Sequence, residues 1–185
     1  MSQEDRKLIR NLCIWGGVFA VFFGSALHFV YGWSGKNFLV GLVAPINESP
    51  WEHMKLVFTP IILFGFIDWI YLRDKVENLC FALMKEVAIA IIFILAVFYI
   101  YTPLVGHSIF AVDISSFVVS IIIAKWFGYL ILTGKFKRFE FKGLNFLSGI
   151  ILVLIAAFFI YATITPPRLN PFLDSVTNSY GIFQK

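Results

Sequence analysis

The segment 45–55, PINESPWEHMK, concentrates side chains that can bind metals and move protons. Glu48, Glu52 and His53 lie close together in it, with the Asn47 amide beside them. Zinc and similar divalent ions favour neutral imidazoles combined with carboxylates, and three protein ligands plus a water form a catalytic site. Such a metal lowers the pKa of its water, and a further carboxylate can take up the proton. One interpretation of the segment is therefore metal-dependent hydrolysis.

The other two histidines, His28 and His107, adjoin different hydrophobic segments. His28 shares a helical face with Tyr31. Asp113 lies inside an apolar segment, where an ionisable side chain by default indicates a functional site. The predicted site comprises His28, His53 and His107 as metal ligands, with zinc as the expected ion, Glu48, Glu52 and Asp113 as catalytic carboxylates, and Asn47, Trp51, Tyr31 and Ser108 as substrate contacts.

The same segment also has the pattern of a helix start. Ser49 as N-cap, Pro50 at the first helical position and Glu52 at the third form a capping box, which satisfies backbone N–H groups that lipid cannot. Trp51 then anchors the helix at the interface and Lys55 extends its ammonium group to water. On this interpretation the polar residues have a structural role.

Capping leaves Asn47, Glu48 and His53 unexplained, so three alternatives stay open. The first is a metal-dependent hydrolase of a lipid or amphipathic substrate. The second is a metal-free protein that binds or transports a polar solute or lipid headgroup. The third is a non-catalytic membrane scaffold.

The composition places these residues in a membrane protein. The chain has 185 residues, of which 59% are hydrophobic, 18% aromatic and only 14% charged. A water-soluble domain carries about 25% charged residues. In a multi-span membrane protein, a net charge of +4 is explained by lysines and arginines in the cytoplasmic loops, which fix the orientation of the chain. Nucleic acid is therefore not an expected partner. The expected partners are the lipid bilayer and a lipid or small polar ligand, and a homo-oligomer is compatible with the sequence.

Five apolar segments, at 12–31, 56–72, 87–101, 109–132 and 144–163, are close to the roughly 20 residues that a membrane-spanning helix needs. We therefore predict an all-α bundle of about five transmembrane helices in one domain, 1–185. The tail, 170–185, keeps apolar residues near its end and is predicted to fold over the outer mouth of the bundle.

Lysines and arginines gather at one set of helix ends, which predicts a cytoplasmic N-terminus and a C-terminus outside. That set holds Arg6, Lys7, Arg10, Arg73, Lys75, Lys135, Lys137, Arg138 and Lys142, whereas the other holds Lys36, Lys55, Arg168 and Lys185. The predicted site then lies on the extracytoplasmic side.

Charged residues within or beside the apolar segments have simpler explanations. Asp68 and Lys125 are expected to form an ion pair or to reach the interface, since pairing keeps charges tolerable in lipid. Lys85 and Glu86 are predicted to be interfacial. Pro60 is predicted to kink its helix and open space beside His53.

Three stretches, HFVYGWSG, PINESPWEHMK and TPPRLNPFLD with a later YGI, resemble an uncharacterised family of small bacterial multi-span membrane proteins marked by N-E-S-x-W-E-H-x-K. The resemblance implies a bacterial cytoplasmic membrane protein and no activity. The histidines, Ser108 and Asp113 also have a loose similarity to the membrane hydrolase superfamily of alkaline ceramidases and hemolysin III-like proteins. That similarity implies a zinc site with three histidines, although the chain has fewer helices than the seven of that superfamily and no late H-x-x-x-H pair.

Overall fold

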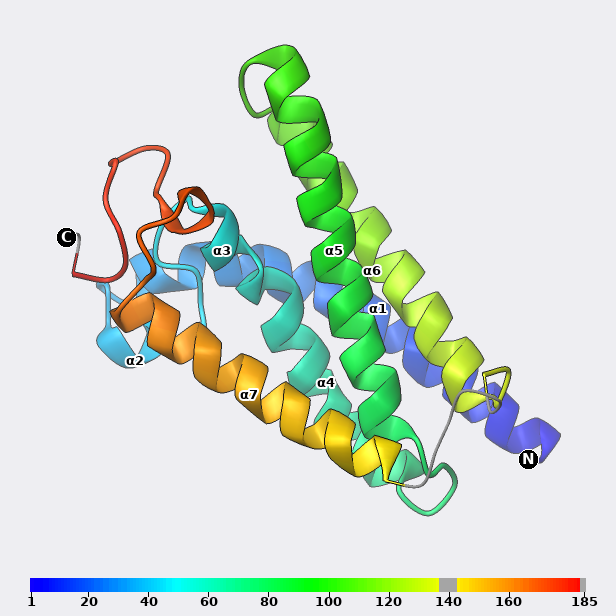
Figure 1. Ribbon diagram of the computed structural model, residues 1–185. Coiled ribbons are helices and arrows are strands. Elements are labelled where there is room, and N and C mark those ends of the chain that lie inside the picture. Colours follow the sequence, from blue (N-terminus) through cyan, green and yellow to red (C-terminus); the bar gives the residue numbers. More distant parts are fainter. Residues whose placement is uncertain (137–142, 184–185) are drawn as a thin grey trace.

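A computed structural model describes residues 1–136 and 143–183, which are mostly helical (Figure 1). Five helices in these ranges are long and apolar enough to cross a membrane, which confirms the predicted all-α class and number of spans. The spans are α1 (Gln3–Trp33), α3 and α4 together (Pro50–His53 and Lys55–Leu72), α5 (Leu79–Val105), α6 (Phe110–Leu132) and α7 (Leu144–Ile164).

Two helices start earlier than predicted, and the reason differs between them. In α1 the Asp5 amide donates to the Ser2 hydroxyl at 3.0 Å, and the Asp5 carboxylate accepts from the Ser2 amide at 3.3 Å. This capping box starts the helix upstream of the apolar run. Helix α5 begins at Leu79, and its first six residues, LCFALM, are apolar and pack largely in the core. The prediction began after Lys85 and Glu86, but Glu86 is buried and paired, so the helix continues through these charges.

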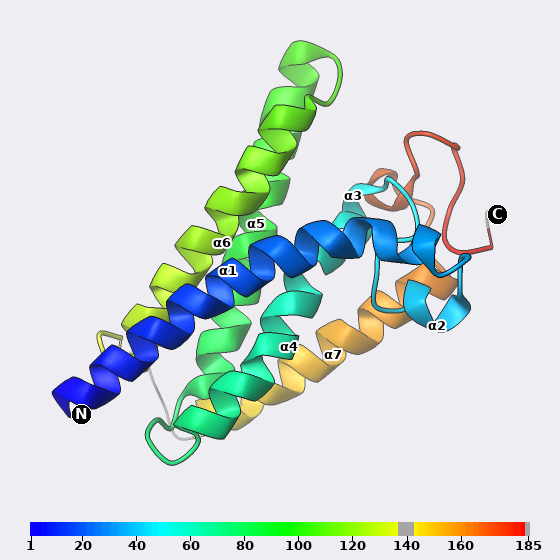
Figure 2. The same ribbon diagram turned by 180° about the vertical axis from the view of Figure 1, so that it is seen from behind.

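The helices form a bundle from which one hairpin projects (Figures 1 and 2). Helices α5 and α6 pack along each other and turn at Gly106, whose φ of +86° lies in the left-handed region that favours glycine. Helix α1 packs against α4 and α6, and α7 packs against α5. The end of the hairpin extends beyond the neighbouring helices.

The short elements gather at the end of the bundle opposite the N-terminus (Figure 1). They are α2 (Phe38–Gly41), α3 and the 3₁₀ turn η2 (Asn170–Phe172). The C-terminal segment folds back there, because Leu173 pairs with Tyr180 and the Ile182 amide donates to the Thr163 carbonyl at 2.9 Å. The segment 45–55 therefore lies among the end of α1, the end of α7 and the tail.

Candidate metal centre

His28, Glu48 and His53 meet at this end of the bundle, from α1, the loop before α3, and α3. One ligand atom from each lies within 4.8 Å of the others. His28 Nε2 is 3.7 Å from Glu48 Oε1, and His53 Nε2 is 3.3 Å from Glu48 Oε2. With bonds of 2.0–2.2 Å, a tetrahedral zinc ion holds its ligand atoms roughly 3.3–3.6 Å apart. These two contacts are made by different oxygens of the Glu48 carboxylate. The three side chains, here called the triad, therefore have the residue types and the approximate spacing of a zinc site.

The His53 ring is oriented by its own backbone. Its Nδ1 lies 2.9 Å from the Ser49 carbonyl oxygen, which can only accept, so Nδ1 carries the proton and donates. In the neutral ring Nε2 then holds the lone pair, and it faces the carboxylate of Glu48. A backbone carbonyl on the far nitrogen is the usual way in which proteins fix a metal-binding histidine.

Two acceptors this close require a cation between them. Glu48 Oε2 and the neutral His53 Nε2 would otherwise repel each other at 3.3 Å, so either a proton or a metal ion must bridge them. When the bridge is a proton on His53 Nε2, the ring donates to Glu48, and this hydrogen bond lowers the pKa of Glu48 more than desolvation raises it. The side chains of His28, Glu48 and His53 are 29%, 47% and 30% exposed, so an ion and a water can reach them.

A close helix crossing brings His28 to His53. Gly24, one turn before His28, packs on the Leu56 carbonyl oxygen of α4 so tightly that a Cβ there would collide with it. Pro60 has no N–H to donate to that carbonyl, which leaves the oxygen facing α1. The ring centroids of His28 and His53 consequently lie 5.3 Å apart.

A buried ion pair holds the loop that carries Glu48. Lys55 Nζ donates to Glu52 Oε2 at 2.7 Å, to Thr163 Oγ1 at 2.5 Å and to the Gly41 carbonyl at 2.9 Å, and Glu52 also accepts from the Ile46 amide at 3.1 Å. Lys55 and Glu52 are 1% and 2% exposed. The network joins α2, the loop, α3, α4 and α7.

These contacts correct two expectations about the same segment. The Ser49 hydroxyl caps α3 by accepting from the Glu52 amide at 3.3 Å, as predicted, but the Glu52 carboxylate turns inward to Lys55 instead of closing a capping box. The prediction that Lys55 extends to water is wrong, because Glu52 offers it a buried partner one turn away.

Residues 2–182 match the sequence pattern of the "Family of unknown function (DUF6512)". The chain belongs to this family. The match agrees with the expected resemblance to an uncharacterised family, although its expected signature is not itself confirmed. No curated protein and no solved structure matches the chain, so the comparisons do not confirm a similarity to the ceramidase and hemolysin III-like superfamily.

Three of the predicted substrate contacts lie near the triad. Tyr31 and Asn47 line a cavity closed by the tail. The Asn47 side chain accepts from the Ser49 amide at 3.0 Å, and its Nδ2 is buried without a partner among the described residues. Trp51 packs on Phe159 and Phe172, with ring centroids 4.8 Å away in each case, so it is a packing residue as well as a candidate contact.

The other predicted residues do not belong to the triad, although Asp113 is close enough to His53 for an electrostatic interaction. His107 and Ser108 are exposed in the loop at the end of the α5–α6 hairpin, and His107 is not part of the triad. The Asp113 carboxylate accepts from the Tyr101 hydroxyl at 2.5 Å, which ties the two helices of the hairpin together. The structure thus brings together two of the three predicted histidines and one of the three predicted carboxylates.

A second buried charge cluster lies toward the other end of the bundle. Lys125 pairs with Glu86 at 2.7 Å, and Asp68 is buried on α4. Glu86 is 2% exposed, so the expectation that it is interfacial is wrong. The ion pair joins α5 to α6, and Gly128 makes room for Glu86 because any Cβ there would collide with its carboxylate.

Two residues that matter to the site had no functional signal in the sequence. Thr163 is a single threonine near the end of an apolar helix, and Gly24 is one of 13 glycines in the chain, so neither stands out. Thr163 acts through its hydrogen bond with Lys55, which is 108 residues away in the sequence. Gly24 acts through its contact with Leu56 on a neighbouring helix. Periodicity along one helix does not identify such contacts.

Proposed function

We propose that the protein is a metal-dependent membrane hydrolase whose zinc ion is bound by His28, Glu48 and His53. The single observation that carries the proposal is the convergence of three ligand atoms within 4.8 Å. The two oxygens of Glu48 lie 3.7 Å from His28 Nε2 and 3.3 Å from His53 Nε2, and the orientation of the His53 ring also supports the proposal. Three protein ligands leave a fourth position for water, as in catalytic rather than structural zinc sites.

The chemistry follows from the surroundings of the triad. A bound zinc ion supplies a water of lowered pKa. Glu48 has two carboxylate oxygens and is about half exposed, so one oxygen can accept a proton from the attacking water. Because the triad lies at the end of membrane-spanning helices, a substrate with an apolar part in the bilayer and a polar part at the interface can reach it. A lipid or another amphipathic molecule is therefore the proposed substrate.

We place the triad on the extracytoplasmic side of the bacterial inner membrane. The support is the excess of lysine and arginine near the opposite helix ends. Labelling of single introduced cysteines by a membrane-impermeant maleimide tests this: Gly32→Cys should react in intact cells and Lys7→Cys only after lysis. The reverse pattern would refute the assignment.

A metal-free recognition site is the second candidate, because a proton instead of a metal can bridge Glu48 and His53. Transport is less well supported. The Lys55 and Asp68 positions are separated by 13 residues of α4, or about 20 Å, and the buried α4 side chains between them include Val57, Ile61 and Phe64. Along α4 the described side chains therefore provide no polar path between the two charge clusters, although α6 has buried hydroxyls at Ser116 and Ser120.

The deciding experiment is the metal content of detergent-purified protein, measured by elemental mass spectrometry after equilibration with zinc and gel filtration. Wild type and His107→Ala should retain close to one zinc per chain. His28→Ala, His53→Ala and Glu48→Gln should lose most of it. Wild-type protein that retains no zinc, or an equal loss in His107→Ala, would overturn the metal site.

Hydrolysis is tested separately, by mass spectrometry of lipid products after reconstitution into vesicles of phosphatidylethanolamine and phosphatidylglycerol. Zinc-loaded wild type should form products that Glu48→Gln does not. If zinc is bound at the triad but neither these lipids nor soluble ester and phosphoester probes are cleaved, the hydrolase assignment fails and a binding role remains.

A further inference from the structure

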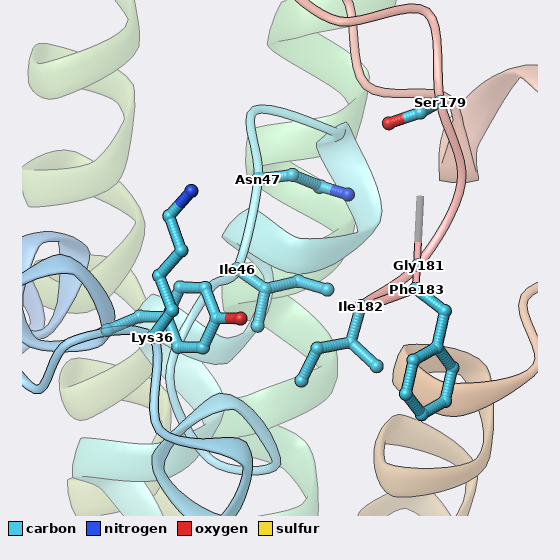
Figure 3. A pocket seen from close by; sticks show the side chains of 8 residues that line it. Lys36, Ile46, Asn47, Ser179, Gly181, Ile182 and Phe183 are labelled. Atoms are coloured by element: carbon cyan, nitrogen blue, oxygen red, sulfur yellow. The ribbon is translucent and has the colours of Figure 1, made fainter. Parts of the chain in front are cut away.

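A cavity of about 260 Å³ lies between the tail and the loop that carries Glu48 (Figure 3). Its polar lining consists of Tyr31, Lys36, Asn47 and Ser179, and the remaining wall includes Ile46 and Ile182. In Figure 3 the Asn47 amide points toward the tail, and Lys36 rises on the opposite side of the cavity. Three separate segments therefore supply polar groups to one small space.

Tyr31, Lys36 and Asn47 can donate into the cavity, whereas the Ser179 hydroxyl already donates to Thr177 at 2.6 Å, because Thr177 donates to Asp174. Lys36 is the charged residue of the lining, carries three N–H donors and has no acidic partner among the described residues. The Asn47 side-chain oxygen is used by the Ser49 amide, which leaves Nδ2 buried and without an acceptor among those residues. An unpaired buried donor is unfavourable, so an arrangement of this kind is completed by an acceptor.

We propose that this cavity binds a phosphate group, carried by an amphipathic lipid. A phosphate offers several oxygens in a tetrahedral arrangement, and these can accept from the Lys36 ammonium, the Asn47 amide and the Tyr31 hydroxyl, which approach from different directions. A compact lysine charge suits it. Ile46 and Ile182 provide an apolar wall for the portion next to the phosphate, which favours a lipid headgroup over a free ion.

The cavity is linked to the triad through the backbone. Asn47 directly precedes Glu48, and Tyr31 lies three residues after His28, about 4.5 Å further along α1. Each of these two segments thus provides one metal ligand and one cavity donor. A phosphate held in the cavity would place the adjoining bonds of the same headgroup near the triad. This substrate assignment rests on the proposed function, whereas phosphate binding itself does not.

Binding is tested on the full-length, detergent-purified protein after zinc removal with a chelator, by calorimetric titration with dihexanoyl phosphatidic acid, inorganic phosphate or dihexanoylglycerol. The phosphatidic acid should bind, and dihexanoylglycerol, which lacks the phosphate, should bind at least tenfold more weakly. Lys36→Met should weaken phosphatidic acid binding at least tenfold, whereas Lys7→Met, which removes an exposed charge at the other end of the molecule, should not.

Asn47→Asp provides the second variant, because it keeps the oxygen that accepts from Ser49 but replaces the Nδ2 donor by a carboxylate oxygen. It should abolish phosphatidic acid binding without unfolding the protein. Inorganic phosphate that binds as tightly as phosphatidic acid, with the same dependence on Lys36, would overturn the lipid assignment and identify a free phosphate as the ligand.

Equal binding of dihexanoylglycerol, or no effect of Lys36→Met and Asn47→Asp, would overturn the phosphate site. Because zinc is absent, a missing metal site leaves this result unaffected. A protein that retains zinc in the metal analysis but does not bind phosphatidic acid would refute the phosphate site and leave the metal site intact.

Discussion

Lys55→Met should destabilise the protein strongly, because it removes one partner of a buried ion pair and leaves the other charged. Lys55 is 1% exposed and donates to a carboxylate, a hydroxyl and backbone carbonyls. Methionine keeps much of the volume but leaves the Glu52 carboxylate uncompensated. Breaking such a pair costs about 3–5 kcal/mol. For a chain of this size that corresponds to a fall in Tm of about 6–20 °C.

The assay is the fraction of detergent-solubilised protein that stays monodisperse on gel filtration after heating at a series of temperatures. The matched control is the double variant Glu52→Gln/Lys55→Met. The glutamine amide is neutral, can accept from the Ile46 amide and can donate to Thr163, so at least half of the loss in Tm should be recovered. A Lys55→Met protein as stable as wild type, or a double variant less stable than the single one, would refute the ion-pair argument.

Three further predictions concern the triad and the second charge cluster. Gly24→Ala should reduce zinc occupancy by separating α1 from α4, whereas Gly32→Ala, with open space around it, should not; metal analysis decides this. Glu86→Gln should lower the Tm by breaking the ion pair with Lys125, but by less than Lys55→Met does, because the Asp68 carboxylate of the same cluster stays near Lys125; heating as above measures the loss. His28→Leu should lose zinc yet match or exceed the wild-type Tm in chelator, because it removes a buried unpaired Nδ1; a lower Tm would indicate a structural histidine.

The spans could be predicted because each is an apolar run that lipid requires, but the helix starts could not. The Ser2–Asp5 capping box lies outside the apolar run of α1, and Lys85 and Glu86 interrupt the apolar run of α5. Glu86 shows the reason most clearly. From the sequence, its charge predicts a position at the membrane–water interface. Burial is tolerable only because Glu86 pairs with Lys125 on another helix, and the sequence does not show that pairing.

The site was predictable in part for a similar reason. Glu48 and His53 are close in sequence, and His28 joins them because α1 ends beside α3. His107 does not, since α5 has 27 residues and a length of about 40 Å against about 27 Å for the 18 residues of α4. The longer helix carries its loop beyond the bundle end. Helix lengths of this kind depend on where each helix starts, and hydropathy placed the start of α5 too late.

The segment NESPWEHMK combines two sets of residues that face different ways. Ser49, Glu52 and Lys55 satisfy one another or the surrounding backbone, and they keep the loop in place with almost no exposure. Glu48 and His53 present ligand atoms outward. The inward set accounts for why a polar stretch is stable at the start of a membrane span. It does not account for the outward set, in which either a proton on His53 or a metal ion must lie between the two side chains. A helix cap requires neither Glu48 nor His53, so the outward set is the part of the segment that indicates a binding function.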